Sequence, residues 1–125
     1  MSMKKILVLC VVVFAGLAQN PTLWNFPHIY TGTANNWQSY NNSPNAIYID
    51  VDYSGLGLVN VPTVIPHLSC SSHCWQTTGG SEVYNLTNTS FRIYVYGLEE
   101  GNTRATPANA NNYGFVLNYV ILSQD

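Results

Sequence analysis

Charged residues are scarce in this sequence, and basic residues are the scarcest. Only 8% of the 125 residues are charged, with four Lys and Arg against six Asp and Glu. Lys4 and Lys5 lie in an N-terminal segment that we expect to be cleaved, so two arginines and six acidic residues remain, a net charge of −4. Because affinity for nucleic acids comes largely from Lys and Arg that neutralise phosphates, this composition argues against a nucleic-acid partner.

Enzyme motifs are also missing. The sequence has no G-x-S-x-G nucleophile turn, no H-E-x-x-H zinc motif and no glycine-rich phosphate loop. Glu99 and Glu100 lie next to each other in an expected loop, and His28 is isolated in the sequence. A nucleophile with its base, a carboxylate pair or an open metal site is therefore not evident. We expect no enzyme activity and no cofactor.

The N-terminus has the pattern of a secretory signal peptide. Lys4 and Lys5 precede an apolar run over residues 6–15, and the small residues Gly16 and Ala18 suit signal peptidase. The run is short for a bilayer core of about 30 Å, and no stop-transfer pattern follows, which disfavours the alternative of a retained anchor. We expect residues 1–18 to be removed and residues 19–125 to form one secreted domain without a membrane span.

Short alternating runs dominate the rest of the chain, and no segment has an apolar period of 3.6 over a helix length. The run 47–53 places Ile47, Ile49, Val51 and Tyr53 on one face. The run 91–96 places Phe91, Ile93 and Val95 on one face and Arg92, Tyr94 and Tyr96 on the other. The run 113–122 is apolar on both faces toward its end. With weaker strands at 27–33, 62–68 and 81–86, the pattern predicts an all-β, six-stranded antiparallel sandwich with loops at 85–90 and 99–112.

Tyrosines stand out on the expected outer faces. Tyr48, Tyr94 and Tyr96 are candidates for a binding surface, because Tyr combines an apolar ring with a polar tip. The competing interpretation is that these rings lie in a seam between identical subunits. Val116, Val120 and Leu122 likewise leave the outer face of the last strand apolar, which predicts a homo-oligomer.

Two cysteines remain after signal cleavage, Cys70 and Cys74. In an oxidising compartment two nearby thiols normally pair, so we predict a disulfide. The alternative is a zinc site that adds His67 and His73. Asp50 and Asp52 lie on one strand face and could bind calcium, but a solvated outer face is the more common arrangement. We expect no metal site.

Three Asn-X-Ser/Thr sequons are predicted N-glycosylation sites, at Asn41, Asn85 and Asn88. Asn20 is excluded because Pro21 follows it. The prediction applies if the chain is secreted from a eukaryotic cell.

Five segments in order resemble the H-type lectins of snail agglutinins and discoidins across nearly the whole mature chain. They are residues 29–37 (IYTGTANNW), 47–53 (IYIDVDY), 62–68 (PTVIPHL), 86–91 (LTNTSF) and 113–119 (YGFVLNY). The resemblance implies a six-stranded antiparallel sandwich that trimerises and binds sugars of the N-acetylgalactosamine type between neighbouring subunits.

The sugar ligands of that family match this chain poorly. The loop after Trp37 (QSYNNSPNA) contains no Asp where the family has one, and Thr78 lies near the position of a sugar-binding Arg. Leu98 and Glu99 stand where the family has Trp-His. Tyr113 corresponds to a residue of the sugar cleft. Planar hydrogen-bonding groups and a stacking ring are still required, and our candidate carbohydrate-binding residues are Trp37, Asn36, Gln38, Tyr113 and Glu99.

The sequence therefore predicts a secreted carbohydrate-binding domain, with sugar bound between subunits of a homo-oligomer, most simply a trimer. The alternative is a structural subunit of an extracellular coat, matrix or filament without specific sugar binding. Low charge and the tyrosine-rich faces suit both functions.

Overall fold

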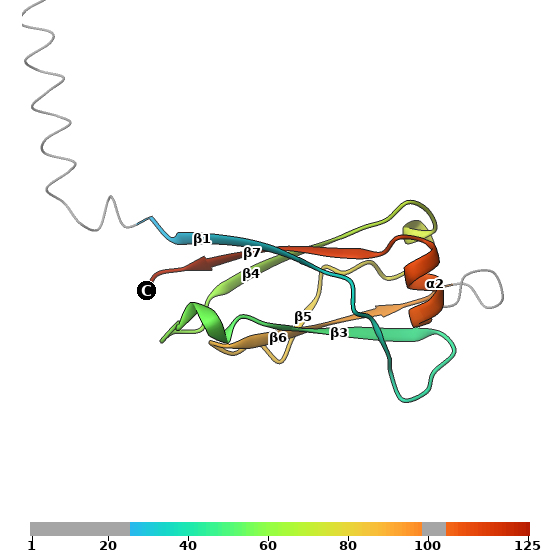
Figure 1. Cartoon of the computed structure of the whole chain (residues 1–125), viewed down its shortest axis with the longest axis horizontal. Coiled ribbons are helices and arrows are strands. Elements are labelled where there is room, and N and C mark those ends of the chain that lie inside the picture. Colours follow the sequence, from blue (N-terminus) through green and yellow to red (C-terminus); the bar gives the residue numbers. More distant parts are fainter. Residues whose placement is uncertain (1–25, 99–104) are drawn as a thin grey trace, which may run out of the picture.

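The computed structural model describes residues 26–98 and 105–125, which form two antiparallel β-sheets packed face to face (Figure 1). One sheet has the strand order β1-β7-β4 and the other has the order β2-β3-β6-β5. The strands are β1 (His28–Ala34), β2 (Gln38–Ser39), β3 (Ala46–Asp52), β4 (Thr63–Ser69), β5 (Val83–Tyr84), β6 (Ser90–Tyr96) and β7 (Val116–Ser123). The predicted all-β sandwich is confirmed, and β2 is a short strand that the sequence analysis did not predict.

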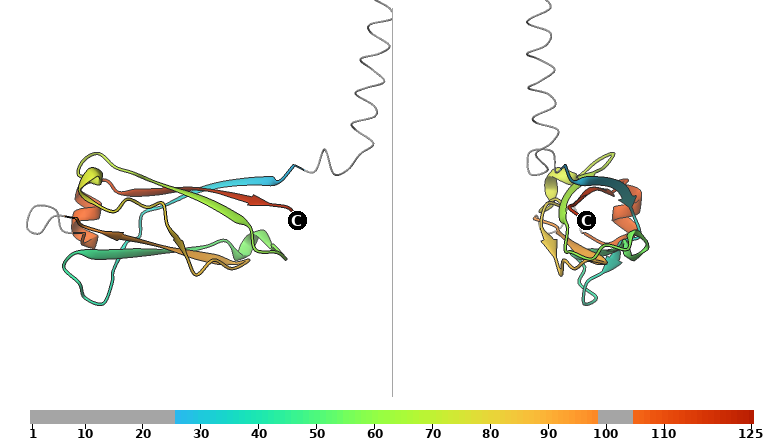
Figure 2. Two further views of the ribbon diagram at one scale, coloured as in Figure 1. Left: turned by 180° about the vertical axis from the view of Figure 1, so that it is seen from behind. Right: turned by 90° about the vertical axis from the view of Figure 1, so that its left-hand side faces the viewer.

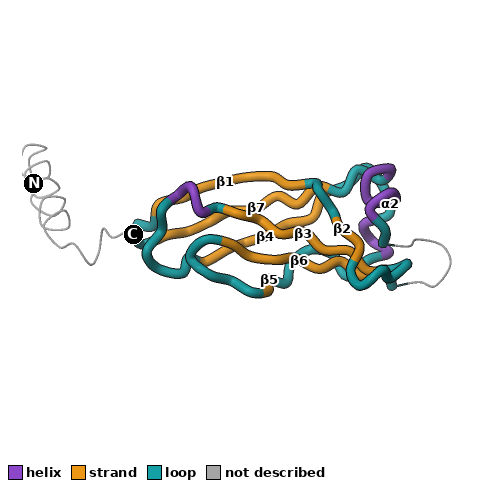
Figure 3. The backbone as a smooth tube through the Cα atoms, turned by 60° about the horizontal axis from the view of Figure 1, so that its bottom comes forward, coloured by secondary structure: helices purple, strands orange, loops and turns teal. Residues whose placement is uncertain are grey.

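The two sheets extend along the same long axis of the molecule, and the end-on view shows them facing each other (Figure 2). β7 is the central strand of its sheet and pairs with β1 on one side and β4 on the other. A short helix, α2 (Pro107–Asn112), covers one end of the sandwich, while the C-terminus lies at the other (Figures 1 and 3). On β7 the inward side chains of Leu117 and Ile121 are buried, whereas the outward Val116, Val120 and Leu122 are only partly buried.

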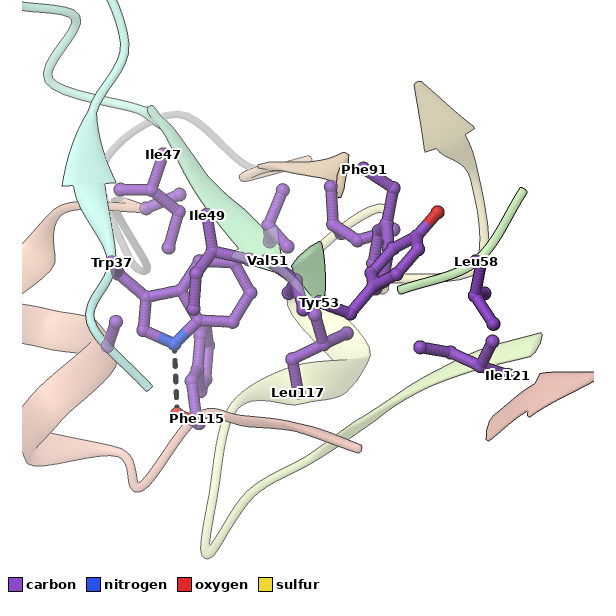
Figure 4. Packing of buried hydrophobic residues seen from close by; sticks show 14 residues of the cluster. Trp37, Ile47, Ile49, Val51, Tyr53, Leu58, Phe91, Phe115, Leu117 and Ile121 are labelled. Atoms are coloured by element: carbon purple, nitrogen blue, oxygen red, sulfur yellow. Dashed lines mark hydrogen bonds between the residues drawn. The ribbon is translucent and has the colours of Figure 1, made fainter. Parts of the chain in front are cut away.

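The interior consists of the inward positions of the alternating strands. Phe91, Ile93, Val95 and Leu117 are almost fully buried, as the sequence predicted. Tyr119, on the inward side of β7, is partly buried and packs edge-on against Phe91, with ring centroids 5.5 Å apart. The predicted inner face of β3 also holds, since Ile47, Ile49, Val51 and Tyr53 all belong to the buried cluster (Figure 4).

Two aromatic side chains link distant segments through hydrogen bonds. The indole Nε1 of Trp37 donates to the carbonyl of Phe115 at 2.9 Å, a bond drawn in Figure 4. The hydroxyl of Tyr53 donates to the carbonyl of Thr87, and burial raises the pKa of this phenol. Each polar tip thus has a partner although its ring lies in the core.

Helix α2 corrects the prediction of an irregular loop over residues 99–112, of which 99–104 lie outside the described residues. Thr106 is the N-cap: its side chain accepts a hydrogen bond from Asn109 N–H at 3.1 Å, and Pro107 follows at the first helical position. Gly114, with φ of 66°, ends the helix in a Schellman arrangement, with Phe115 N–H donating to the Ala110 carbonyl at 2.8 Å. A six-residue helix is too short to show a 3.6-residue period.

The turn between β2 and β3 brings an extra tyrosine to the outer side of its sheet. Asn41 and Asn42 both have positive φ, 49° and 55°, and Ser43 N–H donates to the Tyr40 carbonyl at 2.8 Å. This is the geometry of a type I′ turn, in which Asn is tolerated at left-handed positions. The turn places Tyr40 opposite Ala46, at the edge of the sheet.

Candidate functional site

The outer side of the four-stranded sheet carries a group of tyrosines, which we call the tyrosine face. It consists of Tyr40, Tyr48, Tyr84, Tyr94 and Tyr96, together with Gln38, Asp50 and Arg92. Strand alternation produces this face, because the inward neighbours of these residues on β3 and β6 are buried aliphatic and aromatic side chains.

Strand register aligns the face in rows across the sheet. Gln38 lies opposite Tyr48, which lies opposite Tyr94. In the next row, Asp50 pairs with Arg92 and Tyr84 lies on the far side of Arg92. Cross-strand neighbours on one face have Cβ atoms about 4.5–5.5 Å apart. The side chains therefore form one continuous surface.

Tyr94 is the centre of the aromatic contacts. Its ring lies 5.1 Å from that of Tyr40 and 5.0 Å from that of Tyr84, both edge-on, and 6.2 Å from that of Tyr48. Such edge-to-face pairs contribute about 0.5–1.5 kcal/mol beyond the area they bury. Tyr40, Tyr84 and Tyr96 remain 39%, 48% and 53% exposed. The face is thus ordered internally and still offers ring surface to a ligand.

A charged pair is built into the same surface. Arg92 donates to the Asp50 carboxylate from Nε at 2.6 Å and from Nη2 at 2.7 Å. The guanidinium lies over the Tyr48 ring, 4.1 Å from its centroid, and Nη1 donates to the Tyr94 hydroxyl at 3.2 Å. The hydrogen bonds from Arg92 to the Asp50 carboxylate lower the pKa of Asp50. The hydrogen bonds that Arg92 makes with Asp50 and Tyr94 raise the pKa of Arg92. The face therefore holds a cation whose charge is already balanced.

Beyond Arg92 the surface sinks into an open hollow of about 480 Å³. Seven of its nine lining residues are polar or charged, and they are Asp50, Asp52, Ser54, Asn85, Thr89, Ser90 and Arg92. The Asp52 carboxylate accepts a hydrogen bond from Ser54 N–H at 2.8 Å, and hydrogen bonds with Ser54 lower its pKa. The volume falls within the range of about 300–1,000 Å³ that is usual for small-molecule sites.

The predicted carbohydrate-binding residues that the structure describes differ in their surroundings. Gln38 belongs to the tyrosine face, where its Oε1 accepts from the Tyr48 hydroxyl at 2.8 Å. Asn36 is exposed just before β2. Trp37 is only 7% exposed and hydrogen-bonded inside the sandwich, so a core role replaces the predicted contact with sugar. Glu99 lies outside the described residues.

Tyr113 follows the last residue of α2 and is not part of the tyrosine face. Its ring stacks on that of His73, with centroids 4.1 Å apart and an interplanar angle of 26°. Nδ1 of His73 is buried and has no hydrogen-bond partner in the described part of the chain. One face of the Tyr113 ring is therefore already covered by a neighbour.

Cys70 and Cys74 lie at disulfide distance and form the predicted bridge, with Cα atoms 6.1 Å apart. His73 belongs to this loop, whereas His67 is exposed on β4. Among residues 26–98 and 105–125, no group of three or more His, Cys, Asp or Glu is arranged to hold a metal ion. The bridge favours the disulfide over the zinc alternative.

The outer side of the three-stranded sheet has a different composition, and we call it the aliphatic face. Its apolar members are Ile29, Ile65, Val116, Val120 and Leu122, with threonines between them. Val120 lies between Thr31 and Ile65, and Leu122 lies between Ile29 and Thr63. Ile29 is 66% exposed and Ile65 is 53% exposed.

The three predicted glycosylation sites differ in their surroundings. Asn41 is exposed in the β2–β3 turn, and Asn85 is exposed at the hollow. Asn88 is half-buried, and its Nδ2 donates to the Leu58 carbonyl at 2.9 Å. Asn41 and Asn85 are thus accessible to solvent, whereas the Asn88 amide is hydrogen-bonded to the loop that contains Leu58.

Sequence reasoning identified Tyr48, Tyr94 and Tyr96 as surface candidates but missed how Tyr84, Arg92 and Asp50 complete the face. Tyr84 lies on a strand of two residues that has no alternating pattern of its own. Opposite charges at the outward positions of neighbouring strands were a usable signal, because cross-strand ion pairs are common in sheets.

No protein-family model matches this chain, and no curated protein matches it. None of the helices in the described residues has the length and apolar character needed to cross a membrane.

Proposed function

We propose that this protein is a secreted carbohydrate-binding domain and that the tyrosine face is its sugar-contacting surface. The observation that carries the proposal is the continuous group of tyrosines around Tyr94, with Arg92 and Asp50 set among the rings. Sugars present apolar C–H faces and many hydroxyls. A site for them needs flat apolar rings next to fixed hydrogen-bonding groups.

The parts of the face divide these tasks. Tyr40, Tyr84 and Tyr96 supply partly exposed ring surface. Asp50 supplies carboxylate oxygens with spare accepting capacity. Arg92 holds that carboxylate and covers Tyr48. The donors and acceptors are positioned before a ligand arrives, which reduces the entropy lost on binding.

The charges on the tyrosine face and in the hollow indicate whether the sugar is neutral or charged. Asp50 neutralises Arg92, which is the only cation among the residues that line the tyrosine face and the hollow. An anionic sugar would meet no free positive charge there and would approach Asp50 and Asp52 unfavourably. The face therefore suits neutral glycans.

The aliphatic face supports a homo-oligomer as part of the same function. Ile29 and Ile65 are exposed beside the partly buried Val120, and the outward strand positions of this face include no Lys, Arg, Asp or Glu. A second copy that covers it would bury this surface. Oligomers would present several tyrosine faces together and raise the avidity for polymeric glycans. The trimer implied by the family resemblance is one such arrangement.

A structural subunit remains the second candidate function, and the aliphatic face is the observation that favours it. If self-assembly were the whole function, the tyrosine face would also lie between subunits. Changes on either face would then alter assembly, whereas the lectin proposal restricts that effect to the aliphatic face.

A glycan array on the secreted protein tests the proposal. We expect binding to neutral glycans, and we expect Tyr94→Ala to weaken it strongly because this ring contacts both Tyr40 and Tyr84. Trp75→Ala is the matched control, since Trp75 is an exposed aromatic residue outside the tyrosine face. Silence across neutral glycans, or equal losses in the two variants, would contradict the proposed site.

A further inference from the structure

The sequon at Asn85 opens directly onto the polar hollow. Asn85 is exposed, adopts a left-handed backbone with φ of 53°, and lines the hollow with Ser90 and Arg92. Tyr84, the residue before it, contacts Tyr94 at the edge of the tyrosine face. A group attached to Asn85 Nδ2 would start inside the hollow and lie beside this tyrosine.

The other two sequons provide an internal comparison. Asn88 belongs to the same loop, but its Nδ2 donates to the Leu58 carbonyl and is half-buried. Asn41 is exposed and has a similar φ of 49°, yet it lies in the turn after Tyr40 and does not line the hollow. Only Asn85 combines an exposed sequon amide with the polar cavity.

We infer that Asn85 carries an N-linked glycan whose first sugars fill the hollow and cover the Tyr84 end of the tyrosine face. The hollow offers acceptors on Asp50 and Asp52 and hydroxyls on Thr89 and Ser90, which match sugar hydroxyls. An outside ligand would then contact the open end, near Tyr40. This inference goes beyond the proposed function and does not depend on it.

The modification is a group transfer without oxidation or reduction. The donor is an oligosaccharide carried on a lipid pyrophosphate in the secretory pathway. A bond forms between Asn85 Nδ2 and the anomeric carbon, and the anomeric C–O bond breaks. The pyrophosphate leaves with the electron pair, and the amide nitrogen gives up one proton.

The test compares secreted wild-type protein with Asn85→Gly and Asn41→Gly, made in a eukaryotic host. Glycine tolerates the positive φ at both positions and removes each sequon without adding charge. Glycopeptide mapping gives occupancy, and nitration of each tyrosine by tetranitromethane gives its accessibility. We expect a glycan at Asn85, and nitration of Tyr84 several-fold faster in Asn85→Gly than in wild type or Asn41→Gly.

Two results would overturn the inference. One is an unmodified Asn85 in the secreted protein. The other is a Tyr84 nitration rate that is equal in wild type and Asn85→Gly. Thermal melts of all three proteins check that each is folded before nitration. The readout needs no sugar ligand, so a failure of the proposed function would be seen separately on the glycan array.

Discussion

The two outer faces of this sandwich are built on the same strand alternation and end up with opposite chemistry. The tyrosine face lies on β3 and β6, where rings surround a balanced ion pair and most side chains have polar tips. The aliphatic face lies on β1, β7 and β4, where β-branched side chains predominate and Ile29, Ile65 and Val120 offer only dispersion contacts. Aliphatic surfaces suit another protein surface, while rings with polar tips suit a hydrated ligand. Under the proposed function, the aliphatic face serves assembly and the tyrosine face serves recognition.

The largest effect on stability is expected from a substitution in the hydrophobic core beneath both faces. Phe91→Ala should lower the free energy of unfolding by about 3–5 kcal/mol, because Phe91 is almost fully buried and packs against Tyr53 and Tyr119. Tyr94→Ala, on the outer side of the same strand, should cost much less. Urea unfolding of both variants measures the contrast. Similar losses would show that the tyrosine face is part of the core.

The next effect concerns assembly. Val120→Glu places a charge in the middle row of the aliphatic face, between Thr31 and Ile65. Burying an unpaired carboxylate is costly. We expect wild type to sediment as an oligomer at micromolar concentration and the variant as a monomer that still binds sugar. A monomeric wild type would remove the assembly role from this face, and an unchanged oligomer in the variant would place the interface elsewhere.

A smaller effect separates ring from hydroxyl within the tyrosine face. Tyr94→Phe keeps the ring and loses only the acceptor for Arg92 Nη1. This is one long hydrogen bond, 3.2 Å, on an open surface, and the ring stays in place, so we expect sugar affinity to fall by about tenfold or less. Tyr94→Ala should lose more, because it also removes the contacts with Tyr40 and Tyr84. Calorimetric titration of the two variants with the sugar measures both affinities. Equal affinities would show that the contacts of the Tyr94 ring do not contribute to binding.

The smallest effect is the pH dependence of the ion pair. Hydrogen bonds from Arg92 hold the folded-state pKa of Asp50 below its unfolded value. A depressed carboxyl pKa stabilises the folded state above the unfolded pKa, near 4, and this contribution is lost as the pH falls through the lowered pKa. The pair is partly exposed, so it contributes at most about 1 kcal/mol.

Asp50→Asn tests this sign. The variant should be slightly less stable than wild type at pH 7, and the gap should close below about pH 4 as Asp50 becomes protonated. Melting curves of both proteins from pH 7 to strongly acidic conditions measure the gap. A gap that stays constant across this range would mean that the ion pair does not stabilise the fold.

The core could be predicted from the sequence because strand alternation is a local signal. Phe91, Ile93 and Val95 alternate with polar or amphipathic neighbours, and the structure buries all three. Helix α2 was missed because six residues show no period, although Thr106 followed by Pro107 was a readable start signal.

The candidate site could be predicted only in part. Tyr48 and Tyr94 follow from alternation, but their contact with Tyr40 and Tyr84 depends on a turn and on the register of a two-residue strand. Trp37 was misassigned to sugar contact because a sequence gives no direct measure of burial for a single residue in a loop. The pairing register of strands that are distant in the sequence cannot be read from a local pattern of residues.

The most direct test of the sugar-contacting surface maps a bound neutral glycan by NMR. Ring protons of Tyr40, Tyr94 and Tyr96 report on the open end of the tyrosine face, while the methyl groups of Ile65 and Val120 report on the aliphatic face. The proposal predicts chemical-shift changes that saturate together on the tyrosine rings, with little change in the methyl groups. Changes confined to Ile65 and Val120, or to Tyr113 at the end of α2, would contradict it.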